Sequence, residues 1–368
     1  MSPWDEVRRD FPALSRHVYL NAAAASPTPR PVREAVARFY RELEEDGDGR
    51  WDEWLARREE IRAGVARFIN AEPDEIAFTP NTSAGINLIV DLLEKDGDVL
   101  SDELEFPTVT LPWIHRGVRV HFLPARAGVI EPGAFARDDA PEAAVVAVSH
   151  VQFSNGCRLD LDGFGRTKGP RRLVVCGSQA LGAFAVDVKR SRIDAFATAG
   201  HKWLCAGYGA GFAYISRALL ERPPREMGWL SVEDPYAFDN REYRLLPGAR
   251  RSELGCPPFG PIFGLGAAID YLAGIGAGAI EARVLELNAH LTTRLERAGL
   301  RSLSPGGAHR SGQTLVALDD PPRAAAFLRS RGVLVTEKPL GVRIATHFYN
   351  TEEDVERCLA ALSEYARP

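Results

Sequence analysis

The sequence lacks several features that would place it in a class at once. It has no excess of positive charge, with 45 Lys and Arg against 50 Asp and Glu and a net charge of −5. It therefore gives no support to nucleic-acid binding, which usually leaves a basic footprint. Its first residues show no apolar stretch of the secretory kind, and the weakly charged stretch 254–280 is broken by Gly, Pro and Asp270. We therefore expect no secretion signal and no membrane span.

Cysteine is scarce as well, and its spacing argues against two common uses. The five cysteines include no CxxC pair, so we expect no metal site of the zinc type. Their odd number, without a secretory leader, suggests reduced thiols and a cytoplasmic location. With 368 residues, 45% of them hydrophobic and 26% charged, the chain is long enough for a large domain and a smaller one.

Short apolar runs alternate with helical segments through the first two thirds of the chain. The predicted strands are residues 76–78, 98–100, 118–122, 145–148, 173–175, 195–198 and 211–215. Continuous apolar strands with helices between them indicate an α/β fold with a mainly parallel, seven-stranded sheet covered on both faces. After residue 255 a long helical zone, 262–298, leads into a smaller α+β pattern. We predict a large domain over 15–255 and a small C-terminal domain over 256–368, with residues 1–14 packed on the small one.

Lysine is rare, and one of the five lysines stands apart. Lys95, Lys168, Lys189 and Lys338 lie in polar, loop-like segments, whereas Lys202 follows a predicted strand in ATAGHKWLCAGYGAGFAYI, among apolar residues and glycines. A desolvated ammonium has a lowered pKa, which suits a lysine that forms a Schiff base. The alternative is a partly exposed lysine at the end of a strand.

The segments HKWL and GYGAGF, together with YLNAAAASPTP and GVRIATHFYNTEEDV, resemble the class V aminotransferase superfamily of fold-type I enzymes that use pyridoxal 5'-phosphate (PLP). This superfamily includes cysteine desulfurases and isopenicillin N epimerase-like proteins, and the resemblance covers nearly the whole chain. It implies the fold-type I PLP-dependent transferase fold, PLP as cofactor, a small amino-acid substrate and a homodimer with the site at its interface. It also implies that Lys202 forms the Schiff base with PLP.

On the phosphate side, the resemblance implies four further residues. FTPNTSAGIN matches the phosphate-binding turn, where the Thr82 N–H and the Ser83 hydroxyl would meet the phosphate at a helix N-terminus. An ordinary helix cap is the alternative for this turn. His201 would lie near the phosphate, and Cys256 stands where a threonine usually reaches the phosphate of the partner subunit.

On the ring and substrate side, the matched residues are Phe106, Asn155, Gln179 and Arg343. Phe106 matches the aromatic that stacks on the pyridine ring, although a core phenylalanine is the alternative. Asn155 and Gln179 match polar residues around the 3-hydroxyl of the ring. Arg343 matches the arginine that holds the substrate α-carboxylate in a bidentate pair, the alternative being a surface strand arginine.

Two departures from the family pattern bear on the reaction. Cys176 stands three residues before Gln179, where the family generally carries an Asp that pairs with the pyridine nitrogen. A thiol is neutral below its usual pKa of about 8.5 and is a weak hydrogen-bonding group. No cysteine lies between Cys256 and Cys358, and TEKPLGVR is too short for the persulfide-forming loop of a desulfurase. An ordinary cysteine desulfurase is therefore not expected.

These observations favour an enzyme that acts on an α-amino acid through an external aldimine and removes its Cα–H. A neutral partner for the pyridine nitrogen weakens the electron sink, which handicaps transamination more than α,β-elimination. We therefore predict a lyase, similar to C–S lyases, for a Cβ-substituted amino acid, with Lys202 as the proton-transferring base. An aminotransferase or epimerase is the alternative, and a non-catalytic member of the PLP family is a second one.

Overall fold

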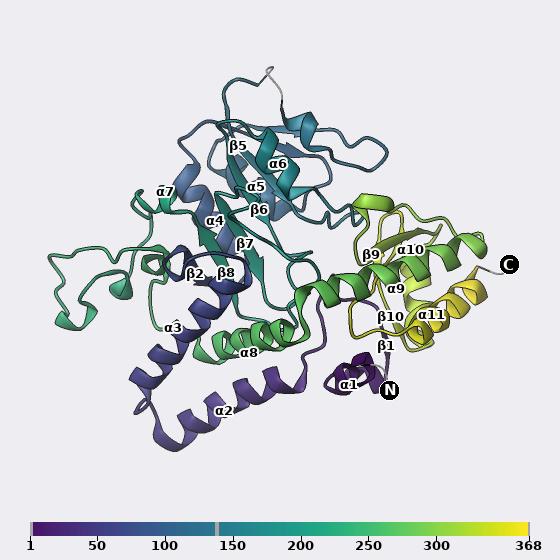
Figure 1. Ribbon diagram of the computed structural model, residues 1–368, viewed down its shortest axis with the longest axis horizontal. Coiled ribbons are helices and arrows are strands. Elements are labelled where there is room, and N and C mark those ends of the chain that lie inside the picture. Colours follow the sequence, from purple (N-terminus) through teal and green to yellow (C-terminus); the bar gives the residue numbers. More distant parts are fainter. Residues whose placement is uncertain (1–2, 137–139, 367–368) are drawn as a thin grey trace.

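The computed structural model describes residues 3–136 and 140–366, and a seven-stranded sheet lies at its centre (Figure 1). The strands are β2 (Ile76–Thr79), β3 (Asp98–Asp102), β4 (Val120–Leu123), β5 (Ala143–Ser149), β6 (Arg172–Cys176), β7 (Ala195–Ala199) and β8 (Gly211–Ile215). Their order is β2-β8-β7-β6-β5-β3-β4. Only β8 pairs antiparallel with its neighbours, β2 and β7. The predicted strands and the mainly parallel α/β class are thus confirmed.

Both faces of this sheet are buried, because successive side chains of a strand point to opposite faces. Val145 packs on one face with α4 (Thr82–Leu93) and α5 (Pro107–His115). Val146 packs on the other face with α2 (Arg30–Asp46), α3 (Trp51–Phe68) and α8 (Phe259–Ile275). The strands therefore lack the apolar–polar alternation of a half-exposed sheet, as the sequence predicted.

The long helical zone predicted over 262–298 is two helices. The first, α8, ends at Gly276, and α9 (Ala277–Arg297) continues at an angle of 80°. Gly276 has a φ of +94°, which a residue with a side chain rarely adopts. Within the described residues no single helix is long and apolar enough to cross a membrane, and α8 and α9 pass that test only as a bent pair.

A smaller sheet lies beside the C-terminal helices and both chain ends (Figure 1). It is antiparallel, with the order β11 (Thr336–Lys338), β12 (Gly341–Ala345), β9 (Gln313–Ala317). Helices α10 (Pro321–Ser330) and α11 (Glu352–Tyr365) pack near it. The strand β11 was not predicted, and it takes Lys338 out of the loop assigned to it from the sequence.

Two sets of contacts cross the boundary predicted at residue 255. Strand β1 (Val18–Tyr19) pairs in parallel with β10 (Val333–Leu334). Helix α1 (Pro3–Arg9), which the prediction already placed on the small domain, is tied to α11 by an ion pair of 2.7 Å between Arg8 and Asp354. Helix α8 packs against α2 and α3 of the first part. The division into 15–255 and 256–368 stays a prediction.

The remaining elements are short. They are α6 (Leu161–Thr167), α7 (Arg217–Leu220) and the 3-10 turns η1 (Pro12–Ser15), η2 (Pro73–Glu75), η3 (Pro132–Phe135), η4 (Trp229–Ser231), η5 (Pro235–Ala237), η6 (Ala249–Ser252) and η7 (Gly307–His309).

Candidate active site

The polar and titratable residues of the candidate site lie at or just after the carboxyl ends of the parallel strands. Ser149 at the end of β5 is the register partner of Cys176 at the end of β6, and Cys176 pairs in turn with Ala197 of β7. The loops that follow these strands carry Gln152, Gln179 and Lys202. Ligands of open α/β sheets bind outside this edge of the sheet.

Lys202 lies in the turn after β7, half-buried, with its Nζ 5.8 Å from the centre of the Phe106 ring. Burial lowers the pKa of Lys202, Cys176 opposes this shift, and the positive charge of Arg343 adds to it. In the described part of the chain no carboxylate forms an ion pair with Lys202, whereas Lys168 and Lys189 contact Asp194 and Glu75 at 2.8 and 2.5 Å. Lys202 therefore carries an uncompensated, partly desolvated amine, as the sequence predicted from its apolar setting.

The residues behind Lys202 form a fixed support. The Trp203 indole N–H donates to Gln179 Oε1 at 3.0 Å, and Gln179 Nε2 donates to the Ala23 carbonyl at 2.9 Å. His347 Nε2 donates to the Trp203 carbonyl at 2.9 Å, and its Nδ1 accepts the Phe348 N–H at 2.9 Å. Both polar ends of Gln179 are therefore already bonded, and its place beside the cofactor ring stays a prediction.

His201 stacks on Tyr208, with ring centres 4.6 Å apart and planes inclined by 13°. Burial and then the neighbouring charge of Lys202 lower the pKa of His201 to about 4. The imidazole is therefore neutral at pH 7, so it can donate or accept a hydrogen bond but brings no positive charge to an anion.

The N-terminus of α4 brings hydroxyl groups next to Cys176. Thr82 Oγ1 lies 2.6 Å from Ser178 Oγ, and the Cys176 thiol donates to the same Ser178 oxygen at 3.4 Å. Ser83 Oγ lies 2.9 Å from Thr108 Oγ1. Asn81 caps the helix by accepting the Ala84 N–H at 2.9 Å, which leaves the other N–H groups of the first turn without a partner inside the helix. Such a turn can hold an anion.

A pair of acids that sequence reasoning missed lies behind Cys176. Glu105 accepts the Ser149 N–H at 2.5 Å, the Ser149 hydroxyl at 2.6 Å and Gln152 Nε2 at 2.7 Å. Asp102 accepts the same Gln152 Nε2 at 3.0 Å and is fully buried. Burial and the nearby charge of Glu105 raise the pKa of Asp102. Two adjacent carboxyl groups, one fully buried and one half-buried, cannot both ionise readily, so the pair retains a proton.

Cys176 itself is buried, with 6% of its surface exposed. Burial raises its pKa, and the charge of Glu105 raises it further, while Ser178 and Lys202 act in the opposite direction. The thiol is therefore neutral at pH 7. The prediction of a neutral group at this position agrees with these surroundings.

Arg343 and Lys338 approach the site from the β11–β12 hairpin. Arg343 is 4% exposed, its Nη1 donates to the Phe153 carbonyl at 3.3 Å, and its Nε has no hydrogen-bond partner. Burial lowers the pKa of Arg343 to about 10. The alternative of a surface strand arginine does not hold, because β12 is the central strand of its sheet; the role of Arg343 toward a substrate stays a prediction. The sequence analysis also did not identify Phe153, whose ring centre lies 5.0 Å from that of Phe106.

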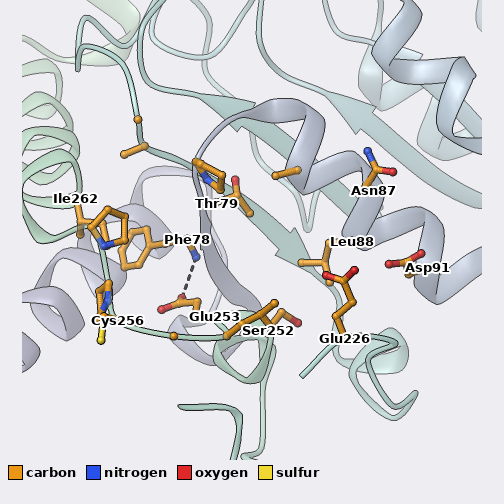
Figure 2. Close-up of a pocket in the computed structure, with 18 of the residues that line it drawn as sticks. Phe78, Thr79, Asn87, Leu88, Asp91, Glu226, Ser252, Glu253, Cys256 and Ile262 are labelled. Carbon is orange, nitrogen blue, oxygen red and sulfur yellow. Dashed lines mark hydrogen bonds between the residues drawn. The ribbon is translucent and has the colours of Figure 1, made fainter. Parts of the chain in front are cut away.

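Two further predicted residues have contacts of other kinds. Asn155 uses its amide within neighbouring loops: Nδ2 donates to the Gly128 carbonyl at 2.7 Å, and Oδ1 accepts the Cys157 N–H at 2.9 Å. Cys256 is exposed and lines a cavity of about 460 Å³ between α4, residues 78–80 and residues 252–258 (Figure 2). Glu253 fixes this segment by accepting the Phe78 N–H at 2.9 Å (Figure 2). The roles assigned to Asn155 and Cys256 stay predictions.

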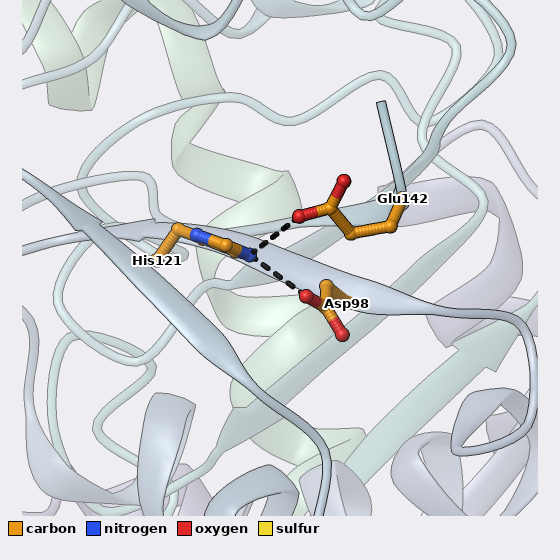
Figure 3. Close-up of side chains that lie close together, drawn as sticks. All are labelled: Asp98, His121 and Glu142. Carbon is orange, nitrogen blue, oxygen red and sulfur yellow. Dashed lines mark hydrogen bonds and ion pairs between the residues drawn. The ribbon is translucent and has the colours of Figure 1, made fainter. Parts of the chain in front are cut away.

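Outside the site, one group among the described residues has the composition of a metal-ligand set. Asp98, His121 and Glu142 meet at the amino end of β3, with His121 Nε2 2.8 Å from Asp98 and 3.8 Å from Glu142 (Figure 3). Arg119 Nε already lies 3.9 Å from the same Asp98 oxygen. The group sits at the opposite end of the strand from Asp102, so it takes no part in the chemistry around Lys202.

A desolvated lysine beside a helix N-terminus, at the carboxyl edge of a parallel sheet, is the arrangement expected of a Schiff-base enzyme. The sequence model described as "Aminotransferase class-V" matches residues 18–358. A probable cysteine desulfurase of Methanothermobacter thermautotrophicus is 30% identical, and isopenicillin N epimerase of Streptomyces clavuligerus is 31% identical, each over 98% of both chains. The apo structure of a cysteine desulfurase from Thermococcus onnurineus NA1 has a TM-score of 0.91 at 27% identity, covering 99% of this chain and 98% of that one.

The chain belongs to the aminotransferase class-V family, and it is a PLP-dependent enzyme. The fold predicted from the family resemblance is confirmed.

Proposed function

We propose that the protein removes the Cα proton of a Cβ-substituted α-amino acid and expels the Cβ substituent by α,β-elimination, with Lys202 as the base. Bound PLP supplies an electron-withdrawing ring that stabilises negative charge at the substrate Cα. The observation that carries the proposal is that Lys202, whose amine has no ion-pair partner among the described residues, lies near a buried neutral thiol, Cys176, at the edge of the sheet.

The described residues fit the cofactor in three respects. The free N–H groups of the first turn of α4, with the hydroxyls of Thr82 and Ser83, suit its phosphate. Lys202 offers the amine for its aldehyde. Phe106 is 43% exposed although it is a large aromatic, so one face is available to stack on the pyridine ring.

Lys202 is suited to proton transfer because its lowered pKa enlarges the fraction of free amine at neutral pH. Arg343 presents a guanidinium with an unpartnered Nε, which suits a bidentate bond to the substrate α-carboxylate. That bond would fix the Cα–H toward Lys202. The Cβ substituent then leaves with its bonding electron pair as the Cα proton is transferred to Lys202.

The choice of elimination rests on Cys176. A neutral thiol stabilises a protonated pyridine nitrogen less than a carboxylate does, because it forms no charge-assisted pair. Elimination suffers less from this loss than transamination, since the leaving group departs while charge develops at Cα. The relatives described as cysteine desulfurases do not alter this choice, because no cysteine lies between Cys256 and Cys358, the segment that leads into Arg343.

The first experiment tests Lys202. The Lys202→Ala variant should lose the visible absorbance of the bound cofactor and the adduct trapped by borohydride, whereas Lys95→Ala, at an exposed lysine outside the site, should keep both. A borohydride adduct on another lysine would overturn the assignment.

The second experiment tests the reaction. S-substituted cysteines should give a keto acid, ammonia and the free thiol. Inversion at Cα without release of the thiol would instead favour an epimerase, the activity named for the relative from Streptomyces clavuligerus. Full conversion of PLP to pyridoxamine phosphate by alanine would favour an aminotransferase.

A further inference from the structure

Three cations surround one pair of aromatic rings in the candidate site. Phe153 packs edge-on against Phe106. Lys338 Nζ lies 4.6 Å from the centre of the Phe153 ring, and Lys202 Nζ lies 5.8 Å from the centre of the Phe106 ring. Arg343 donates to the Phe153 carbonyl. The two side chains from the hairpin and Lys202 therefore meet across Phe153 and Phe106.

The pairing of strand β11 with β12, and not the local sequence around Lys338, places this side chain beside Phe153. In the β11–β12 hairpin, Lys338 is the register partner of Gly341, and Thr336 is the partner of Arg343. Residues 336 and 338 of a strand point to the same face. Lys338 and Arg343 are thus held on one short, rigid unit, and the half-buried stem of Lys338 lies along an aromatic ring.

The positive charge of this cluster has no counter-ion among the described residues. No ion pair within 4 Å joins a carboxylate to Lys202, Lys338 or Arg343 in this part of the chain. By contrast, the buried Arg62 is paired with Glu253 at 2.5 Å. Burial, then Arg343 and then Lys202, lowers the pKa of Lys338 to about 8. Buried charge that is left unpaired is costly, so such clusters mark places where a ligand brings the opposite charge.

The cations outnumber the negative groups that the proposed function assigns to them. Lys202 is used by the cofactor, and Arg343 by the substrate α-carboxylate. Lys338, on the β11–β12 hairpin beside Phe153, is then left without a negatively charged partner. A substrate that fills the space along Phe153 would extend its side chain toward this ammonium.

We propose that Lys338 binds an oxyanion at the end of the substrate side chain, so that the preferred substrates are α-amino acids with an acidic side chain. This inference rests on the proposed function for the placement of the α-carboxylate on Arg343. Lys338 is a residue that determines specificity, and it takes no part in breaking bonds.

Binding of paired ligands to the holoenzyme tests the inference. Glutarate carries two carboxylates, and glutaramate is its isosteric mono-amide, so calorimetry on the two isolates the second charge. The unaltered protein should bind glutarate at least about tenfold more tightly, because a hydrogen bond between charged groups adds that much affinity. Lys338→Gln should abolish this difference and leave glutaramate binding unchanged. Lys338→Arg should keep it, and Lys95→Gln, at an exposed lysine elsewhere, should have no effect.

Steady-state kinetics supply a second readout with the same logic. S-carboxymethylcysteine and S-carbamoylmethylcysteine differ only in the charge of the side chain. Lys338→Gln should raise KM for the first by about tenfold, with kcat and the KM for the second unchanged.

Two results would overturn the inference: equal affinity of the unaltered protein for glutarate and glutaramate, or a difference that survives in Lys338→Gln. Failure of the proposed function looks different. If neither cysteine derivative releases a thiol while the glutarate preference depends on Lys338, the elimination is wrong and the acidic side-chain site stands.

Discussion

Two buried arginines of this chain should respond in opposite ways to the same substitution. Arg62 on α3 is 2% exposed, and its guanidinium contacts Glu253, Glu59 and the Ile76 carbonyl. Arg343 on β12 is 4% exposed, makes one bond of 3.3 Å to a carbonyl and leaves its Nε unpartnered. Arg62 has the contacts of a structural residue. Arg343 has hydrogen-bonding capacity left over, which is expected of a residue that binds a ligand.

Replacement by methionine separates these roles in free energy. Arg62→Met leaves the Glu253 carboxylate buried without its main partner, and breaking a buried pair costs about 3–5 kcal/mol. Arg343→Met removes a desolvated charge that has no counter-ion, and it gives up one neutral-acceptor hydrogen bond worth about 1–2 kcal/mol. The free energy of unfolding of Arg343→Met should therefore stay within about 1 kcal/mol of the unaltered value, since the two effects oppose each other.

The same variant should lose substrate affinity. A bidentate charged pair with an α-carboxylate contributes about 2–4 kcal/mol, judged from 1.5–3 kcal/mol for one hydrogen bond to a charged group. KM should rise by about 30- to 700-fold, because each 1.4 kcal/mol corresponds to a factor of ten. The absorbance of bound PLP should not change.

Urea unfolding followed by circular dichroism, with initial rates on the same preparations, measures both effects. If Arg343→Met loses as much stability as Arg62→Met, the cation cluster is a structural network and the argument for a ligand there fails. If stability and KM are both unchanged, the substrate carboxylate is bound elsewhere.

Three further predictions concern charge and assembly. Cys176→Asp should raise the conversion of PLP to pyridoxamine phosphate by alanine and should destabilise the protein without cofactor, because the new carboxylate lies near Glu105; unchanged conversion would mean that Cys176 only fills space. The folded-state pKa of His347 is lowered to about 3, chiefly by burial, so the unfolded chain binds the extra proton below pH 6.5. Stability should therefore fall with pH from 6.5 to about 3, by about 1.4 kcal/mol per unit from this residue, and urea unfolding of His347→Gln should show a shallower slope. We also predict a homodimer by light scattering, in which Cys256 reacts with a thiol reagent faster when the protein is diluted to monomers; a stable monomer that binds PLP tightly would contradict this.

The sheet and Lys202 could be predicted because their signals are local. An apolar run such as 145–148 is buried wherever it lies, and Lys202 is surrounded by apolar residues in its own segment. The break at Gly276 is different, since a glycine is tolerated within a helix and only the packing of α8 against α2 and α3 turns it into an 80° bend.

Lys338, Asp102 and Glu105 could not be found in the same way. TEKPL reads as an exposed turn, and Lys338 becomes half-buried only because β11 pairs with β12 opposite Phe153 from a distant loop. Asp102 ends β3 and Glu105 lies just after it, and both have polar neighbours in the sequence; the burial of Asp102 depends on β3 lying between β4 and β5. Asn155 is the opposite case, a residue that the sequence assigned to the site by its match to a family position. That match could not predict that its amide donates to the Gly128 carbonyl.

The charges near Lys202, which are the cations Lys338 and Arg343 and the acids Asp102 and Glu105, give a physical reason for the cysteine at position 176. Cations from the hairpin lie beside Phe153, and the Asp102–Glu105 pair lies at the carboxyl ends of β3 and β5. That pair already retains a proton, because burial and mutual repulsion raise the pKa of Asp102. A third carboxylate at position 176 would add repulsion, because the charge of Glu105 already acts on this position and is opposed by that of Lys202. A thiol avoids this cost. If Cys176 faces the ring nitrogen, as we propose, the same arrangement gives that nitrogen a neutral neighbour, which is the basis of the proposed preference for elimination over transamination.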